Sequence, residues 1–189
     1  MKEPTRYRAV VLTLCHLHLM AKQLIAITGF MAAGKTTVGR ALAARLGCQF
    51  VDLDELMTAQ QKRSISEMIK TDGEDRFRQL ETETLTEVLP ASDDVVIALG
   101  GGTWAKEQNR RLLNEQNARV VWLDAPFELC WQRIPTGNDG RPLAPSREAA
   151  EKLYRARRPV YELAELRLAV SAGQSAEECA SAITAVLLK

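Results

Sequence analysis

Short apolar runs alternate along the chain with longer segments in which apolar residues recur every three or four positions. Runs of four or five apolar residues are typical of buried strands, whereas the longer spacing is typical of amphipathic helices. The runs predict strands at Leu24–Thr28, Phe50–Leu53, Val95–Leu99, Val120–Leu123 and Arg167–Val170. The longer segments predict helices at Thr36–Leu46, Ser64–Lys70, Glu74–Leu89, Ala105–Asn117, Phe127–Arg133, Arg147–Ala164 and Ala176–Leu188. Because strands and helices alternate and the strands are almost continuously apolar, we expect an α/β fold with a parallel sheet covered by helices on both faces.

The first strand and the first helix flank the most informative motif, G-F-M-A-A-G-K-T at residues 29–36. It fits the phosphate-binding loop G-x-x-x-x-G-K-[ST], which requires a strand before it and a helix after it. The N–H groups of such a loop and the positive end of the helix attract an anion. We therefore expect nucleotide binding, with Lys35 on the β- and γ-phosphates and the Thr36 hydroxyl on Mg²⁺. The predicted contacts in this segment are Gly29, Ala32, Ala33, Gly34, Lys35, Thr36 and Thr37.

Two aspartates, Asp52 and Asp54, stand at the end of the second predicted strand. If the strand includes both, they lie on the same side, at the carboxyl edge where ligands bind in open α/β sheets. One carboxylate would hold Mg²⁺ through water, and the other would orient or deprotonate an attacking hydroxyl. The alternative is that the aspartates cap the next helix, with Asp54 as the N-cap before Glu55.

Two further segments contain candidate binding groups. Arg78 and Glu81 are three residues apart on a predicted helix, so Glu81 can fix a guanidinium that is suited to gripping a carboxylate. A surface ion pair is the alternative interpretation. Gly100, Gly101 and Gly102 follow the third predicted strand, where they either let a ligand touch the backbone or form a merely flexible loop.

A long irregular segment at residues 134–146 has two glycines and three prolines around Arg141, which indicates a mobile lid. Before it, Asp124 ends a predicted strand in a way that resembles a magnesium-binding motif. Because Ala125, Pro126 and a predicted helix follow, we expect Asp124 to be a turn or cap residue and not a catalytic one.

Composition argues against several classes of function. Lys and Arg total 25 against 24 Asp and Glu, so no overall charge favours nucleic acid or a membrane surface. Aromatic residues are sparse at 5%, which argues against a stacking surface for single-stranded nucleic acid. The four cysteines lie far apart without a C-x-x-C pair, which indicates a reducing compartment. Both histidines, His16 and His18, precede the phosphate loop, so we expect neither a histidine base nor a metal cluster of protein ligands.

The length of 189 residues predicts a single domain, which we place at residues 22–189. Residues 1–21 form an N-terminal extension that is polar and basic up to residue 8 and mostly apolar from residue 10. This order resembles a signal peptide, but two histidines interrupt the apolar run and no clear A-x-A cleavage site follows. Met20 lies just before the first predicted strand and could be the initiating methionine. We therefore expect the extension either to be disordered or to result from a translation start assigned too far upstream.

Together, these motifs resemble the shikimate kinase family. The phosphate loop, D-L-D, F-R-x-x-E, the triple glycine, R-P-L in the lid and R-R-P-V-Y at residues 157–161 occur in that family's order and spacing. The resemblance implies a three-layer P-loop NTPase fold with a five-stranded parallel sheet in the order 2-3-1-4-5. It also implies phosphorylation of the 3-hydroxyl of shikimate by ATP with Mg²⁺, in a cytoplasmic monomer on the route to chorismate and the aromatic amino acids.

The same resemblance assigns roles on the substrate side. Asp54 would contact the substrate hydroxyls, including the attacking one. Arg78 and Arg157 would clamp the carboxylate of shikimate, while Gly101 and Gly102 would supply backbone contacts.

On the nucleotide side, Lys35 would take part in catalysis and Arg133 would pack on the adenine. Arg141 would move in with the lid, contact the nucleotide and neutralise charge on the transferring phosphoryl group. Thr36 and Asp52 would support Mg²⁺, Asp52 indirectly.

The chain departs from the family at two places. The family often has glycine where this chain has Ala32, so the phosphate loop must tolerate a Cβ atom there. The adenine-side segment at residues 171–174 matches only loosely, so no contact is assigned to it.

Another small-metabolite kinase with this loop, such as a gluconate kinase, is the closest alternative. It would share the phosphate loop and the lid but need a differently arranged polyol site, and the discriminating feature is the pair Arg78 and Arg157 directed at one carboxylate. Adenylate kinase-like activity fits less well, because it has no use for D-x-D and F-R-x-x-E. A GTP switch would need D-x-x-G and N-K-x-D, and neither occurs. A non-catalytic nucleotide-binding module would not need Asp54 or Arg141.

Overall fold

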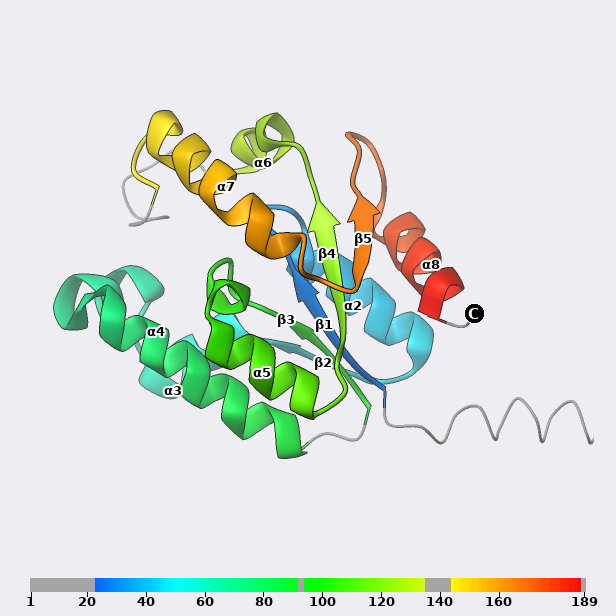
Figure 1. The fold of residues 1–189 in the computed structure, drawn as a ribbon, viewed down its shortest axis with the longest axis horizontal. Coiled ribbons are helices and arrows are strands. Elements are labelled where there is room, and N and C mark those ends of the chain that lie inside the picture. The colour runs from blue at the N-terminus through cyan, green and yellow to red at the C-terminus, as the bar shows by residue number, and fades with distance from the viewer. Residues whose placement is uncertain (1–22, 92–93, 135–143, 188–189) are drawn as a thin grey trace, which may run out of the picture.

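The structure is a computed structural model that describes residues 23–91, 94–134 and 144–187. Its central layer is a sheet of five parallel strands (Figure 1). The strands are β1 (Leu24–Thr28), β2 (Gln49–Asp52), β3 (Val95–Ala98), β4 (Arg119–Asp124) and β5 (Leu166–Ala169). Their order, β2-β3-β1-β4-β5, confirms the expected order. The first and last residues of each strand lie within one residue of the predicted ones.

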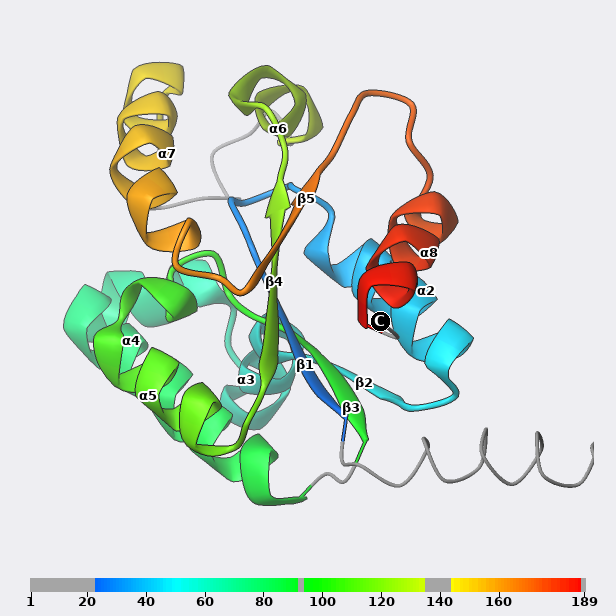
Figure 2. The ribbon, with the colours of Figure 1, turned by 45° about the vertical axis from the view of Figure 1, so that its right-hand side comes forward.

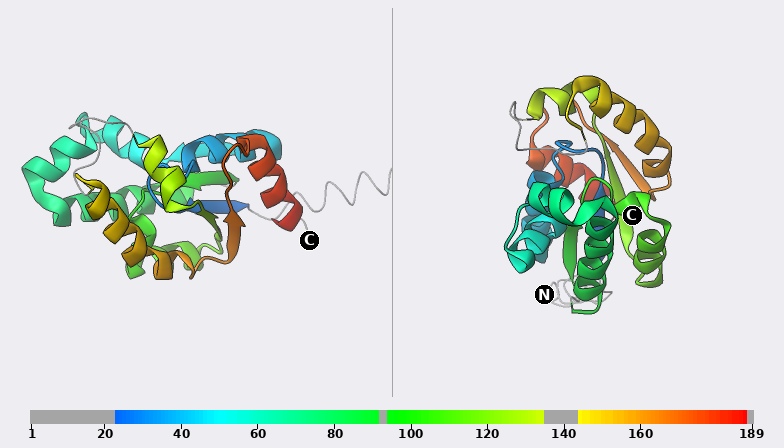
Figure 3. Two further views of the ribbon diagram at one scale, coloured as in Figure 1. Left: turned by 90° about the horizontal axis from the view of Figure 1, so that it is seen from above. Right: turned by 90° about the vertical axis from the view of Figure 1, so that its left-hand side faces the viewer.

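Helices cover both faces of this sheet. They are α2 (Lys35–Leu46), α3 (Leu53–Gln61), α4 (Ile65–Ala91), α5 (Glu107–Glu115), α6 (Phe127–Arg133), α7 (Arg147–Tyr161) and α8 (Ala176–Leu187), with a 3₁₀ turn, η1 (Thr103–Ala105). Figure 2 shows α2 and α8 on one side of the sheet and α4 with α5 on the other. The view from above in Figure 3 shows the sheet between these helical layers. The predicted three-layer α/β architecture is therefore confirmed.

The inner strands are continuously apolar because helices pack on both of their faces. All five residues of β1 and all four of β3 are buried, whereas β5, at the edge, alternates half-buried and exposed residues.

A second apolar cluster lies apart from the main core and joins α3 to α4. Its buried members are Met57, Met68, Phe77 and Leu80. The helix that carries Arg78 is therefore held by an apolar cluster that is separate from the main core.

The chain passes directly from strand to helix between Asp52 and Leu53. The apolar pattern does not predict α3, because no turn separates the strand residues from the helix residues. Asp52 caps α3, since its side chain accepts hydrogen bonds from the backbone N–H groups of Asp54 at 3.0 Å and Glu55 at 3.2 Å. The prediction of one strand carrying both aspartates is therefore wrong, and so is Asp54 as the N-cap. Asp54 lies in the first turn of α3.

Two predicted helices form a single element, α4, that is broken at Gly73. The backbone angles of Gly73, φ 84° and ψ 163°, belong to a region that is open almost only to glycine. The break redirects the chain just before Glu74, and the segment after it carries Arg78. The predicted helix at Ala105–Asn117 is likewise divided, into η1 and α5.

Two predicted features lie outside the described residues. They are the extension at residues 1–21 and the part of the lid that contains Arg141. Within the described part of the chain, no helix is both long enough and apolar enough to cross a membrane.

Candidate active site

The phosphate loop joins β1 to α2 at the carboxyl edge of the sheet (Figure 1). The backbone angle φ is 145° at Gly29 and 98° at Gly34, values that glycine adopts readily. A Cβ atom on Gly29 would also lie 2.8 Å from the carbonyl oxygen of Leu123 in β4. Gly34 is the N-cap of α2, and no described side chain caps that helix. The first N–H groups of α2 can therefore bind an anion in the loop.

Lys35 is the first residue of α2, and its side chain reaches back across the loop. Its Nζ atom donates a hydrogen bond to the carbonyl oxygen of Phe30 at 3.0 Å. This bond holds a half-buried ammonium group at the loop, where it adds positive charge to the N–H groups of the backbone. The loop is thereby suited to a group that carries several negative charges, such as the phosphates of a nucleotide.

Thr36 and Asp52 join the start of α2 to the start of α3. The Thr36 hydroxyl donates to one carboxylate oxygen of Asp52 at 2.6 Å, while the other oxygen caps α3. A hydroxyl and a carboxylate are oxygen ligands of the kind that Mg²⁺ prefers, and this ion usually keeps several waters and phosphate oxygens. Among the described side chains, no group of three His, Cys, Asp or Glu residues could hold a metal ion. The pair therefore fits an ion that takes its other ligands from a nucleotide and water.

An open cleft of about 460 Å³ begins at the phosphate loop. Many of the predicted nucleotide and metal residues line it together, namely Ala32, Ala33, Gly34, Lys35, Thr36, Thr37, Asp52 and Arg133, and Asp54 lies there with them. The cleft continues to Gln174 and Ser175, between β5 and α8, which the sequence analysis did not assign. The available signal was their position after the carboxyl end of a parallel strand, where ligands bind in such sheets.

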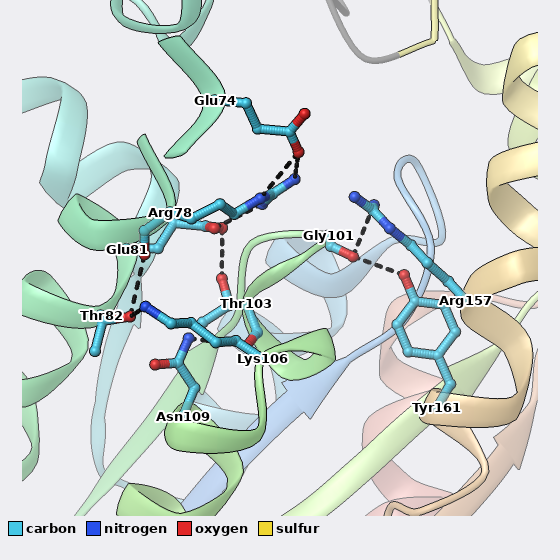
Figure 4. A network of polar contacts seen from close by, with 10 residues as sticks. All are labelled: Glu74, Arg78, Glu81, Thr82, Gly101, Thr103, Lys106, Asn109, Arg157 and Tyr161. Carbon is cyan, nitrogen blue, oxygen red and sulfur yellow. Dashed lines mark hydrogen bonds and ion pairs between the residues drawn. The ribbon is translucent and has the colours of Figure 1, made fainter. Parts of the chain in front are cut away.

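A buried carboxylate organises the other end of the site. Glu81 in α4 is only 2% exposed, and it accepts hydrogen bonds from Arg78 at 2.6 Å and from the Thr103 hydroxyl at 2.7 Å (Figure 4). Burial lowers the pKa of Arg78, but the neighbouring carboxylates of Glu81 and Glu74 outweigh that effect and raise it above its usual value. Arg78 is therefore a permanently charged, oriented cation. The surface ion-pair interpretation is wrong, since Glu81 is buried.

The outer side of the Arg78 guanidinium is bonded to Glu74. The Nε and Nη2 atoms of Arg78 donate to one Glu74 oxygen at 3.3 and 3.0 Å, while Nη1 is bonded to Glu81. The Glu74 side chain is 50% exposed, so it is held less firmly than Glu81. The carboxylate of a ligand could therefore replace Glu74 on Arg78 with a smaller loss of free energy than replacing Glu81 would need.

The three glycines after β3 allow polar side chains to approach the backbone closely. A Cβ atom on Gly100 would lie 2.6 Å from a Glu81 oxygen and 2.7 Å from an Asp54 oxygen. A Cβ atom on Gly102 would overlap the Arg78 guanidinium. The interpretation of this segment as merely a flexible loop is therefore wrong.

Arg157 reaches the same loop from α7. Its side chain is buried, and its Nη1 atom donates to the carbonyl oxygen of Gly101 at 2.9 Å. Figure 4 shows the guanidinium groups of Arg78 and Arg157 pointing toward one another from α4 and α7, with Gly101 between them. Asp54 borders this space through its approach to Gly100. The structure thus brings together all five predicted substrate residues, Asp54, Arg78, Gly101, Gly102 and Arg157.

Comparisons with known proteins identify the family. A family model described as "Shikimate kinase" matches residues 31–188. The chain belongs to the shikimate kinase family. The shikimate kinase of Geobacter sulfurreducens is 42% identical over 162 residues, which cover 84% of this chain and 87% of that protein.

Solved structures agree as well. The structure of shikimate kinase from Acinetobacter baumannii in complex with shikimate is 32% identical, with a TM-score of 0.83, and the match covers 91% of this chain and 96% of that one. A gluconokinase from Sinorhizobium meliloti is 19% identical, with a TM-score of 0.56 and coverage of 89% and 96%. This second likeness shows the fold and nothing more.

In this member of the shikimate kinase family, Asp124 has a structural position that the sequence did not predict. It is 8% exposed and accepts hydrogen bonds from Arg158 at 2.8 Å and from Arg167 at 2.8 Å. Pro126, and not Asp124, is the N-cap of α6, so the cap half of the turn-or-cap prediction is wrong, while the bond from the Ala125 N–H to the Leu123 carbonyl at 3.1 Å forms a tight turn at Asp124. The two guanidinium groups lie 5.1 Å from the ring centre of Trp122, so Asp124 joins β4 to α7 and β5.

The family's frequent glycine in the phosphate loop is replaced here by Ala32, whose φ is 59°. An L residue in this left-handed region is strained by roughly 1–2 kcal/mol relative to glycine. The strain lies in the loop that the nucleotide would contact, so the native loop is conformationally costly as well as functional.

We expect Ala32→Gly to raise the free energy of unfolding by roughly 1 kcal/mol, because the strain exceeds the backbone entropy that glycine adds to the unfolded chain. Chemical denaturation measures this change. Ala33→Gly is the matched control, since Ala33 is not among the positive-φ residues, is buried, and should lose stability. A loss in both variants would contradict the strain at Ala32.

Proposed function

We propose that the chain transfers the γ-phosphoryl group of ATP to the 3-hydroxyl of shikimate, giving shikimate 3-phosphate and ADP. The observation that carries this proposal is the pair of guanidinium groups, Arg78 and Arg157, that face one small space beside the phosphate loop and Asp54 (Figure 4). A carboxylate can accept hydrogen bonds from both, which is the geometry needed for a small carboxylic acid that also carries hydroxyls.

The phosphate loop and the start of α2 bind the phosphates of ATP. Lys35 leaves the Phe30 carbonyl and donates to the β- and γ-phosphate oxygens, where it neutralises charge that grows in the transition state. Arg133, at the end of α6, lines the cleft and packs on the adenine. From the resemblance to the family, Arg141 would neutralise charge on the transferring phosphoryl group.

Thr36 and Asp52, which are hydrogen-bonded to one another, are the residues that would hold Mg²⁺, with Asp52 in an indirect role. When bound, this ion neutralises phosphate charge and orients the γ-phosphoryl group. Asp52 keeps the two hydrogen bonds to the backbone of α3, so its side chain stays oriented as the ligands change.

The acceptor binds with its carboxylate between Arg78 and Arg157 and displaces Glu74 from the outer side of Arg78. Its 3-hydroxyl then lies between Asp54 and the γ-phosphorus atom. The oxygen forms a bond to phosphorus, the bond from phosphorus to the ADP oxygen breaks, and Asp54 accepts the hydroxyl proton.

Further parts of the proposal rest on the family and not on the geometry. The enzyme acts in the cytoplasm, as a monomer, on the route to chorismate and the aromatic amino acids.

The proposal is tested by coupling ADP release to a spectroscopic signal in the presence of ATP and Mg²⁺. We expect turnover with shikimate and only background rates with gluconate or AMP, because AMP has no carboxylate for the arginines and the open-chain polyol of gluconate would place its hydroxyls differently relative to Asp54. Faster turnover with gluconate would replace the proposed function by that of a gluconate kinase. ATP binding without turnover of any of the three would indicate a nucleotide-binding module.

We expect Asp54→Asn to lower kcat by about 10²- to 10⁴-fold while ATP affinity stays close to that of the wild type, because the amide cannot accept the proton. Single-turnover phosphoryl transfer and nucleotide titration separate the two effects. Glu55→Gln is the matched control, as Glu55 is the next residue and pairs with Arg40 at the surface. Turnover near the wild-type value in Asp54→Asn would contradict the role.

We expect Arg78→Lys to raise KM for shikimate by about 10- to 100-fold, because lysine keeps a charge beside Glu81 but cannot donate in a fork. This variant is sharper than Arg78→Ala, which would leave a buried carboxylate unpaired. Steady-state kinetics with each substrate varied in turn measure the effect. Arg76→Lys, an exposed residue on the same helix that pairs with Glu83, should change neither KM. An unchanged KM for shikimate in Arg78→Lys would contradict the proposal that Arg78 and Arg157 together bind the carboxylate of shikimate.

A further inference from the structure

Tyr161 is a buried polar residue that the mechanism above does not use. It lies one helical turn after Arg157 on α7 and is 2% exposed. Its hydroxyl donates to the carbonyl oxygen of Gly101 at 2.7 Å, the same oxygen that accepts from Arg157 (Figure 4). A carbonyl oxygen has two lone pairs, so it can accept both bonds at once.

The glycine loop needs an external contact to hold one conformation. Three successive glycines have more backbone freedom than any other tripeptide, and a binding site requires that freedom to be lost before the ligand arrives. Two of the three carbonyls are bonded within the loop, Gly100 to the N–H of Thr103 and Gly102 to the N–H of Ala105. The carbonyl of Gly101 is held from α7 instead, by side chains.

Fixing this carbonyl also fixes the next N–H group. The carbonyl of Gly101 and the N–H of Gly102 belong to one planar trans peptide, so they point in opposite directions. With the oxygen directed to α7, the N–H of Gly102 is directed away from that helix. A bond to one atom of Gly101 therefore orients the backbone donor next to Arg78.

Tyr161 also determines how much of Arg157 is available to a ligand. If Arg157 were the sole partner of the Gly101 oxygen, a substrate carboxylate would have to compete with the loop for the guanidinium. With the phenol bonded to the same oxygen, Arg157 can turn its N–H groups to the substrate while the loop keeps its place.

The phenol is well suited to this task because it is protonated and rigidly held. Burial raises the pKa of Tyr161 to about 12, so its O–H donates at any working pH. The Trp122 ring lies 6.2 Å from the Tyr161 ring, and the indole N–H of Trp104 donates to the carbonyl oxygen of Val160 at 2.9 Å. The segment after β3 is thus hydrogen-bonded to two adjacent residues at the end of α7, Val160 and Tyr161.

We propose that Tyr161 is a positioning residue for the acceptor: its hydroxyl fixes the Gly101–Gly102 peptide and so leaves Arg157 for the substrate carboxylate. The assignment rests on the proposed function, because the acceptor is taken to be shikimate. Tyr161 does not touch the reacting atoms and acts through Gly101 and Arg157.

The test compares Tyr161→Phe with Tyr154→Phe. Tyr154 is on the same helix, and its hydroxyl also donates to a backbone carbonyl, that of Ala125 at 3.1 Å. Each variant keeps its ring and loses one bond to a carbonyl, and Tyr154→Phe also loses the bond that its hydroxyl accepts from Arg158 at 3.2 Å, so the control removes at least as many hydrogen bonds. Kinetics with shikimate and with ATP, equilibrium binding of shikimate, and amide hydrogen exchange at residues 100–104 are measured for both variants.

In Tyr161→Phe we expect KM and Kd for shikimate to rise roughly tenfold, with kcat and KM for ATP within twofold, because only binding of the acceptor is weakened. Exchange at residues 100–104 should become faster in this variant and not in Tyr154→Phe. Equal shikimate constants in the two variants would overturn the assignment, as would a Tyr161→Phe protein that does not fold. Failure of the wild type to turn over shikimate would instead reject the proposed function, which keeps the two conclusions separate.

Discussion

The substrate side of this molecule depends on the burial of one carboxylate, that of Glu81. A buried carboxylate is stable only if it is paired and hydrogen-bonded. Arg78 supplies the charge and Thr103 supplies a hydroxyl, and together they tie the middle of α4 to the loop after β3. The loop must come close to reach them, and Gly100 permits this, since a Cβ atom there would collide with Glu81 itself. One electrostatic requirement therefore sets the position of a helix, a loop and the guanidinium group of Arg78.

The nucleotide side is organised in a similar way around Asp52. One of its oxygens caps α3 and the other binds the hydroxyl of Thr36, so this side chain joins two helices at the edge of the sheet. The same cap places Asp54 in the first turn of α3, from where it reaches the glycine loop. The two halves of the site thus meet at two aspartates on one short stretch of chain. A change in the strand-to-helix transition would move both halves.

Helix α7 contacts the glycine loop through Arg157 and Tyr161. Asp124 holds it through Arg158, and the bond from Trp104 to Val160 holds its last turn. Arg157 and Tyr161 then meet Gly101 from a fixed helix and not from a loop. Sites on rigid elements keep their geometry before the ligand binds, which lowers the entropy lost on binding. Arg78, on the other side, has a replaceable partner in Glu74.

The sequence by itself determined the strands, most of the helices and the phosphate loop, which follow from local periods and from motifs whose spacing is read along the chain. The five residues proposed for the substrate side came from the resemblance of these motifs to the family. The tertiary structure decided that Asp52 caps a helix, that Glu81 is buried, and that Tyr161 shares an oxygen with Arg157. Gly101 is 56 residues from Arg157 and 60 from Tyr161, and no local pattern records such a contact. Burial and long-range hydrogen bonds depend on how the layers pack. Only the folded chain therefore shows which side chains contact the glycine loop at residues 100–102.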